Sequence, residues 1–200
     1  MPVVLATGAQ SDLGSIAALP AQSRAKPGVL NMGTPGNGST PHLAVELFAH
    51  AAGIGLTHVP YKGAAQAITD ALAGHIQAVA VNALEVLPHV RPGKMRVLAV
   101  LSPQRAAILP DVPTIAESDF PGFEAAVWYG LVGPAGLPGA VAARLHAEVQ
   151  KALAGADLQG RLTAAGGEPL PGPVACFSSL LASAQLRYAK LIREARIQPD

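Results

Sequence analysis

Apolar and polar positions alternate in a regular way through the first half of the chain. Short apolar runs, rich in Val, Leu, Ile and Ala, are followed by turns containing glycine or proline and then by longer amphipathic segments. Such runs are typical of buried strands, and the amphipathic segments are typical of helices. We therefore expect an α/β protein with a mostly parallel sheet covered on both faces. The pattern predicts strands at residues 2–6, 29–32, 56–59, 76–81 and 95–101, and helices at 41–52, 64–73 and 84–90, with a weaker helix ahead of residue 27.

The second half of the chain has a mainly helical pattern. Residues 103–122 are expected to form a loop, in which Thr114 and Glu117 have the spacing of a capping box. One more strand is expected at 125–132, where Trp128 is expected to serve in packing. Three amphipathic helices with so few strands to cover indicate part of a domain whose sheet is incomplete. The helices are predicted at 139–154, 158–165 and 174–195, with a short extended piece at 168–170.

The stretch 33–42 has the residue types of an anion-binding turn. It joins an expected strand to an expected helix, and Gly36 and Gly38 can take positive φ angles that aim consecutive backbone N–H groups inward. Thr40 is a good N-cap, and Pro41 suits the first helical position. The free N–H groups and the positive end of the helix dipole then point at the turn. The sequence therefore predicts an anion site at the start of this helix.

Two further polar residues are expected beside this turn. Lys62 follows the strand at 56–59, and Asn82 follows the strand at 76–81. The carboxyl ends of parallel strands meet at one edge of a sheet, which is where such folds bind their ligands. Lys62 is equally consistent with a ligand counter-ion and with an ordinary surface charge.

Composition and charge exclude several classes of protein. A hydrophobic content of 50% and a mean hydropathy of +0.34 are ample for a buried core. Fourteen basic and thirteen acidic residues give a net charge of +1 without a basic cluster, so no nucleic-acid partner is expected. No apolar run approaches the roughly 18 residues that indicate a membrane span. The N-terminus has neither the basic region nor the apolar run of a signal peptide, so the chain as written carries no export signal.

The single cysteine and the spaced histidines do not predict a metal or cofactor site. Cys176 lies in an apolar helical pattern and is expected to be a buried structural thiol. His42, His50 and His58 recur every eight residues, but they fall on different expected elements, so a shared metal is not expected. We expect these histidines to face solvent or to be hydrogen-bonded, with His42 close to the anion site.

Other interpretations of the glycine turn remain open on pattern alone. The turn is a broken GxGxxG motif with Pro41 in place of the third glycine, and it lacks the Gly-Lys-Ser/Thr ending of a P-loop, which disfavours nucleotide binding. The alternative function is a serine-dependent hydrolase or other small-anion enzyme that uses residues Gly36 to Thr40. Ser39 lacks the Gly-x-Ser-x-Gly elbow expected of such a nucleophile. A purely structural turn before a helix is the remaining alternative.

Eight motifs occur in a set order along the chain: Gly36-Asn37-Gly38-Ser39, His42-Leu43-Ala44, His58-Val59-Pro60-Tyr61-Lys62-Gly63, Leu87-Pro88-His89-Val90, Gly93-Lys94, Leu98-Ala99-Val100, Leu109-Pro110-Asp111-Val112-Pro113-Thr114, and Trp128-Tyr129-Gly130 to Pro134-Ala135-Gly136. In this order they resemble the Bug family of extracytoplasmic solute receptors. These are the substrate-binding proteins of tripartite tricarboxylate transporters. The resemblance covers essentially the whole chain.

The resemblance implies a type II periplasmic-binding-protein-like fold, in which two α/β lobes close on a ligand by a hinge motion. Residues 1–28 then correspond to a remnant of the first lobe, 29–123 to the second lobe, and 124–200 to a crossing strand and helices that complete the first lobe. The implied function is non-catalytic binding of a small carboxylate in the periplasm, with the membrane permease subunits of the transporter as partners. The implied ligand-binding residues are Gly36, Asn37, Gly38, Ser39 and Thr40 in the carboxylate loop, with Lys62 and Asn82 near the cleft.

Family members begin with a signal peptide and a first-lobe βαβ segment, and this chain begins after that segment. The resemblance therefore implies an incomplete first lobe and weak ligand binding by this chain alone. It also implies exposed apolar surface near Val3, Leu5 and the final helix, with self-association as a consequence. Without an export signal, the chain expressed as written is expected in the cytoplasm.

Overall fold

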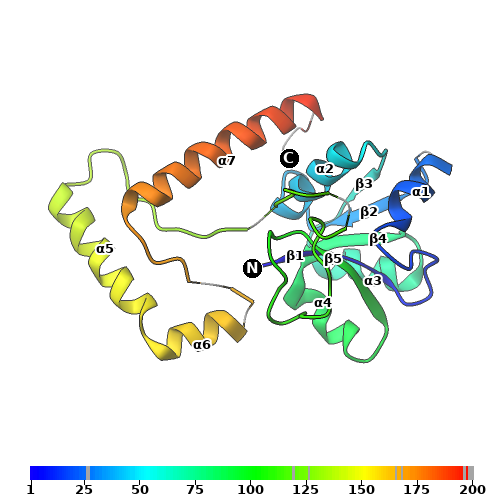
Figure 1. Ribbon diagram of the computed structural model, residues 1–200, viewed down its shortest axis with the longest axis horizontal. Coiled ribbons are helices and arrows are strands. Elements are labelled where there is room, and N and C mark those ends of the chain that lie inside the picture. Colours follow the sequence, from blue (N-terminus) through cyan, green and yellow to red (C-terminus); the bar gives the residue numbers. More distant parts are fainter. Residues whose placement is uncertain are drawn as a thin grey trace.

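Five strands form one sheet in the computed structural model, which describes residues 1–25, 28–118, 120–125, 127–164, 166–167, 169–195 and 197. The strand order across the sheet is β3-β2-β4-β1-β5 (Figure 1). β2 is parallel to β3 and β4, whereas β1 is antiparallel to both of its neighbours, β4 and β5. β5 therefore runs in the same direction as β2, β3 and β4, which confirms a mostly parallel sheet. The strands are β1 (Val3–Gly8), β2 (Asn31–Thr34), β3 (Thr57–Pro60), β4 (Ala78–Asn82) and β5 (Met95–Val100).

β1 lies in the middle of this sheet, where Val4 is paired with Val81 on one side and with Val100 on the other. All six residues of β1 are buried, because helices cover the central strands on both faces. This position corrects one expectation, because Val3 and Leu5 are buried and not exposed.

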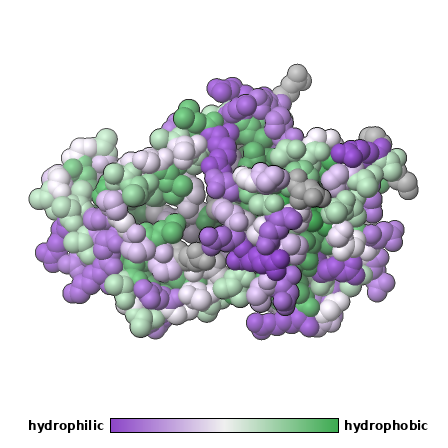
Figure 2. Space-filling view, viewed as in Figure 1, coloured by the Kyte–Doolittle hydropathy of each residue, from purple (hydrophilic) through white to green (hydrophobic). Residues whose placement is uncertain are grey.

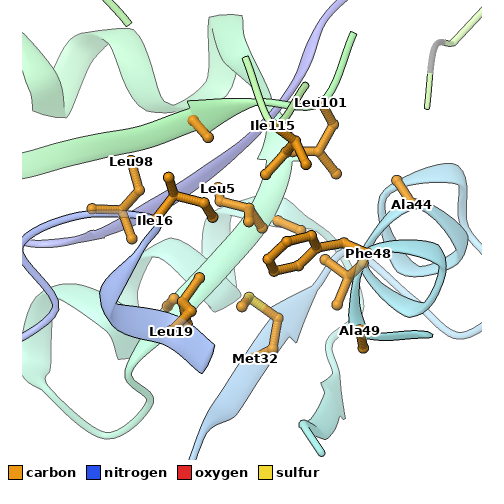
Figure 3. Packing of buried hydrophobic residues seen from close by; sticks show 14 of the residues in the cluster. Leu5, Ile16, Leu19, Met32, Ala44, Phe48, Ala49, Leu98, Leu101 and Ile115 are labelled. Carbon is orange, nitrogen blue, oxygen red and sulfur yellow. The ribbon is translucent and has the colours of Figure 1, made fainter. Parts of the chain in front are cut away.

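Helices pack on both faces of the sheet. α1 (Ala18–Ala25) and α2 (Thr40–Ala52) cover one face, and α3 (Ala64–Ala73) and α4 (Ala83–Val90) cover the other. Side chains of β1 alternate between the two faces, so Leu5 joins one hydrophobic cluster and Val4 joins the other. Figure 3 shows the first cluster, in which Phe48 of α2 lies near Met32 of β2. The rings of Phe120 and Phe123 stand edge-on to Phe48, at centroid distances of 5.3 and 6.1 Å.

The later helices form a separate layer that we call the helical arm. It consists of α5 (Gly139–Leu153), α6 (Ala156–Ala164) and α7 (Val174–Glu194). Figure 1 shows the arm extending away from the sheet, with α7 reaching back toward α2, which it contacts. α5 and α6 have no buried residues, and α7 buries only Ala184 and Leu191.

Apolar side chains remain on the surface of the arm and of the segment that leads into it. Figure 2 shows hydrophobic residues at the surface of this part of the molecule. Val174 is 59% exposed and Leu186 is 76% exposed, which confirms the expected apolar surface at the final helix. Cys176 is exposed, so the expectation of a buried thiol is wrong. The apolar pattern of α7 is correct, but Cys176 lies on an exposed side of the helix.

The strand expected at 125–132 does not form within its described residues, 125 and 127–132. Leu131 and Val132 are more than three-quarters exposed. The Ala125 N–H donates to the Leu101 carbonyl at 2.8 Å, but the described residues of this segment do not pair with a strand of the sheet. Trp128 nevertheless packs edge-on against Phe177 of α7, at a centroid distance of 5.6 Å, which confirms its packing role. Of the extended piece expected at 168–170, Glu168 lies outside the described residues, and 169–170 form no strand.

Candidate functional site

The predicted site residues lie at one edge of the sheet. The register pairs Thr34 at the end of β2 with Pro60 at the end of β3, and β4, which ends at Asn82, is the other neighbour of β2. The carboxyl ends of these three parallel strands therefore meet, as ligand-binding edges of α/β sheets do. The glycine turn, Lys62 and Asn82 all follow these strand ends, so the topology brings the predicted residues to a common edge.

The glycine turn leads directly into α2. We call residues 35–40 the anion loop. Gly38 takes a left-handed conformation with φ of 70°, whereas Gly36 does not have a positive φ, so the expectation is correct for only one of the two glycines. Ser39, with φ of −63° and ψ of 156°, is the N-cap, and its Oγ accepts a hydrogen bond of 3.4 Å from the His42 backbone N–H. The cap is therefore one residue earlier than predicted, and Thr40 is the first residue of the helix.

The loop uses part of its donor capacity internally. The Gly38 N–H donates to Nδ1 of His42 at 3.0 Å, and the Ser39 N–H donates to the Gly36 carbonyl at 3.3 Å. The expected inward array of glycine N–H groups is therefore only partly available to a ligand. The Thr40 N–H finds no acceptor within the described part of the chain. The Ser39 hydroxyl can still donate, because a hydroxyl has one proton as well as the lone pairs that accept.

The donors that are not used inside the loop lie at the N-terminus of α2, where an anion is stabilised. All residues of the anion loop are half-exposed, and the N-terminus of the 13-residue helix α2 lies directly behind them. Pro41 at the helix start has no backbone N–H, so this position has no donor that would need an acceptor. The Thr40 N–H, the hydroxyls of Ser39 and Thr40 and the positive end of the helix dipole together form a partly open site for a negatively charged oxygen.

Two stacked histidines lie behind the anion loop. The imidazole rings of His42 and His58 are 3.6 Å apart at their centroids and 8° from parallel. Nε2 of His42 is 3.6 Å from a carboxylate oxygen of Glu46, and Nε2 of His58 is 2.7 Å from the Thr34 hydroxyl. Both histidines are hydrogen-bonded, as expected. The stacking could not be predicted from local pattern, because it depends on the parallel register that places β3 beside β2.

Lys62 and Asn82 have different surroundings. Lys62 is exposed, and its backbone N–H donates to Gln66 Oε1 at 3.3 Å. Asn82 is half-buried at the N-cap of α4, where its backbone N–H donates to Glu85 Oε2 at 2.8 Å. Asn82 therefore has a local structural role in addition to its place at the sheet edge.

Tyr61 directly precedes Lys62 and is half-buried. Its hydroxyl donates to Asp70 at 2.7 Å. Burial, together with this hydrogen bond, raises the pKa of Tyr61 to about 12, and the same bond lowers the pKa of Asp70. The Tyr61 backbone N–H donates to the Thr34 carbonyl at 3.0 Å, so this segment is fixed to the strand that precedes the anion loop.

The geometry gives no support to a serine hydrolase. Ser39 Oγ is bonded to the backbone of His42, while the ring nitrogens of His42 face Gly38 and Glu46. The described residues contain no cluster of three or more His, Cys, Asp or Glu side chains placed to hold a metal ion. Within the same part of the chain, no helix has both the length and the apolar character needed to cross a membrane.

The fold is that of the α/β periplasmic binding proteins, since solved receptor structures superpose on the whole chain. The chain belongs to the TctC family, the tripartite tricarboxylate transporter family of receptors, whose sequence profile matches residues 1–197. This confirms the resemblance drawn from the ordered motifs, and the family is one of binding proteins and not of enzymes.

Two curated relatives are longer than the chain. A UPF0065 protein from the tcbD-tcbE intergenic region of Pseudomonas sp. strain P51 is 36% identical over 201 residues, and BugT of Bordetella pertussis is 34% identical over 194 residues. These alignments include 100% and 97% of the chain, but 60% of each relative. The chain therefore spans about 60% of the length of these curated relatives.

Solved structures agree in the fold. The R. palustris protein Rpa4515 with adipate has a TM-score of 0.85 and 31% identity, and it covers all of this chain while the chain covers 67% of it. MatC (Rpa3494) of Rhodopseudomonas palustris, with bound malate, has a TM-score of 0.79 and 27% identity, covering 96% of this chain and 66% of its own.

Proposed function

We propose that this polypeptide binds a small carboxylate at the anion loop, as part of a solute-binding receptor that serves a tripartite tricarboxylate transporter. The observation that carries the proposal is the outward-facing start of α2, where the Thr40 N–H has no acceptor in the described chain and the Ser39 hydroxyl can donate. The proposal is further supported by two relatives whose structures are described as holding adipate and malate.

The proposed ligand-binding residues are those that the sequence singles out. Gly36, Asn37, Gly38, Ser39 and Thr40 form the loop around one carboxylate group, and Lys62 and Asn82 lie along the same sheet edge. Lys62 is the exposed cation of this set, so it is proposed as a counter-ion for the rest of the ligand.

The 200-residue polypeptide by itself is expected to bind weakly. A helix N-terminus contributes about 0.3–1 kcal/mol toward an anion, or up to ~2 kcal/mol when partly buried. Each hydrogen bond to a charged oxygen adds about 1.5–3 kcal/mol. Loss of translational and rotational freedom costs about 4 kcal/mol or more. A few donors from one loop therefore leave little net affinity.

The proposed partners follow from the family. The membrane permease subunits of the transporter are the proposed recipients of the ligand, in the periplasm. Self-association through exposed apolar side chains of the helical arm and of the segment that leads into it is a further proposal, supported by Leu131, Val132 and Leu186, each more than three-quarters exposed.

The test is a titration of the ¹⁵N-labelled polypeptide with adipate, malate, succinate and citrate, in which binding is monitored through the amide chemical shifts. Millimolar binding with the largest shifts at Ser39 and Thr40 is expected, and 1,6-hexanediol, which has no carboxylate, should leave these amides unchanged. Ser39→Ala should weaken binding about tenfold through loss of one charge-assisted hydrogen bond. Ser178→Ala is the matched control, because Ser178 is exposed on α7 and its hydroxyl donates within that helix. Shifts that avoid the anion loop, or equal binding by Ser39→Ala, would remove the loop from the site.

A further inference from the structure

The anion loop is braced from two sides by the stacked histidines. On one side, Nδ1 of His42 accepts the Gly38 N–H at 3.0 Å. On the other side, His58 Nε2 is 2.7 Å from the Thr34 hydroxyl, which donates to the Gly36 carbonyl at 3.2 Å. The ring pair thus connects to both ends of the short turn between Gly36 and Gly38.

The hydrogen bond from Gly38 fixes the protonation pattern of the His42 ring. A backbone N–H can only donate, so Nδ1 of His42 must present a lone pair, and the ring proton lies on Nε2. Nε2 faces Glu46 Oε1 at 3.6 Å, where that proton points toward a carboxylate oxygen. Glu46 and the stacked His58 ring are the titratable groups that the contacts of the described residues place against His42.

The ring of His42 has little freedom to leave this position. Its side chain is only 4% exposed, and the parallel His58 ring covers one of its faces. Gly38, in contrast, is the residue type with the greatest backbone freedom, and its φ of 70° is one of several conformations open to glycine. The rigid imidazole therefore selects one conformation of the flexible residue that directly precedes the Ser39 cap.

We propose that His42, held in place by His58, is a positioning residue of the anion loop, which fixes Gly38 and thereby the places of the Ser39 hydroxyl and the Thr40 N–H. The part of this inference that concerns ligand affinity rests on the proposed carboxylate binding at the loop. The part that concerns the turn itself is independent of any ligand.

The ligand-free test is NMR of the wild-type polypeptide. Long-range ¹H–¹⁵N spectra should show His42 with its proton on Nε2, and hydrogen exchange of the Gly38 amide should be slowed by the bond to Nδ1. In His42→Phe, which keeps a flat ring for stacking but has no acceptor, the Gly38 amide should exchange about tenfold faster. A proton on Nδ1, or equal Gly38 exchange in the two proteins, would overturn the proposal without reference to carboxylate binding.

The ligand-bound test compares adipate affinity among variants. His42→Phe should weaken binding roughly fivefold to tenfold, and His42→Asn should restore most of it, because the Asn Oδ1 can accept the Gly38 N–H in place of Nδ1. His50→Phe is the matched control, since His50 lies on the same helix but is 63% exposed. Unchanged affinity in His42→Phe, or no rescue by a folded His42→Asn, would exclude the positioning role. If the wild type itself binds no carboxylate, the proposed function fails, and the exchange measurement still decides whether His42 holds the turn.

Discussion

The sheet half of the molecule, residues 1–118, and the helical arm use apolar residues in opposite ways. β1 is buried along its whole length and packs with helices on both faces, whereas α5 and α6 bury none of their residues. Both parts contain amphipathic helices, so local sequence pattern is sufficient to specify a helix in either. Burial requires a partner surface, and within the described chain only the sheet half supplies one on both sides. Most of the stability is therefore expected to reside in the sheet half.

The largest expected effect contrasts one core residue with one arm residue. Phe48 is fully buried between α2 and the sheet, and Leu145 of α5 is 54% exposed. Phe48→Ala is expected to lower the free energy of unfolding by about 3–5 kcal/mol, because it leaves a cavity in the core. Leu145→Ala is expected to change it by less than about 0.5 kcal/mol. Urea denaturation of both variants measures the difference, and a comparable loss in Leu145→Ala would show that the arm has a packed core of its own.

An intermediate effect contrasts a glycine of the sheet half with a glycine just ahead of the helical arm. Gly38 of the anion loop and Gly136 ahead of α5 both have positive φ, of 70° and 83°. Replacing either by Ala places a Cβ in the left-handed region and is expected to cost about 1–2 kcal/mol. Only Gly38→Ala should also weaken carboxylate binding, because only Gly38 adjoins the Ser39 cap. Thermal unfolding measures the backbone strain in each variant, and adipate titration measures the change at the site. Equal adipate affinity of the two variants would place the loop outside the binding site.

The smallest expected effect is a pH dependence that differs between the two parts. Burial and the bond to Asp70 raise the pKa of Tyr61 to about 12, above the value of about 10 in an unfolded chain. The unfolded chain loses this proton first, so the stabilisation is present below about pH 10 and is lost as the pH rises toward 12. In the arm, burial raises the pKa of Tyr188, while Arg187 opposes the shift.

Ultraviolet titration of the phenolates checks this difference. Tyr61→Phe should remove the most alkaline transition, and it should make stability less sensitive to pH between about 10 and 12. Tyr188→Phe serves as the counterpart in the arm and should leave that transition in place. Persistence of the most alkaline transition in Tyr61→Phe would contradict the assignment.

The sequence predicted local structure better than long-range pairing. α3 begins at Ala64 and ends at Ala73 as expected, because Gly63 and Gly74 mark its ends, and Gly74 takes the left-handed conformation of a helix cap. The position of β1 could not be predicted, since its pairing with β4 and β5 joins residues far apart in the chain. The prediction of a strand at 125–132 was wrong for a related reason. Its apolar residues suit a strand, but a strand also needs a neighbour that the local sequence does not specify.

The candidate site likewise combines features that the local sequence predicts with features that depend on strand pairing. The turn, its helix and the common sheet edge were predictable from glycine spacing and from the strand–helix order. The N-cap moved from Thr40 to Ser39, a one-residue error of the kind expected at helix ends. The role of His58 was not predictable, because its ring meets His42 only after β3 pairs with β2.

The central place of β1 has a consequence for the order in which the sheet can assemble. β1 is first in the sequence, yet its partners, β4 and β5, lie at Ala78–Asn82 and Met95–Val100. β2, β3 and β4 can pair as consecutive units, but β5 can join the sheet only through β1. β1 can therefore pair with neither neighbour until β4 has been synthesised. Such non-local pairing raises contact order, so insertion of β1 is expected to limit the rate of folding.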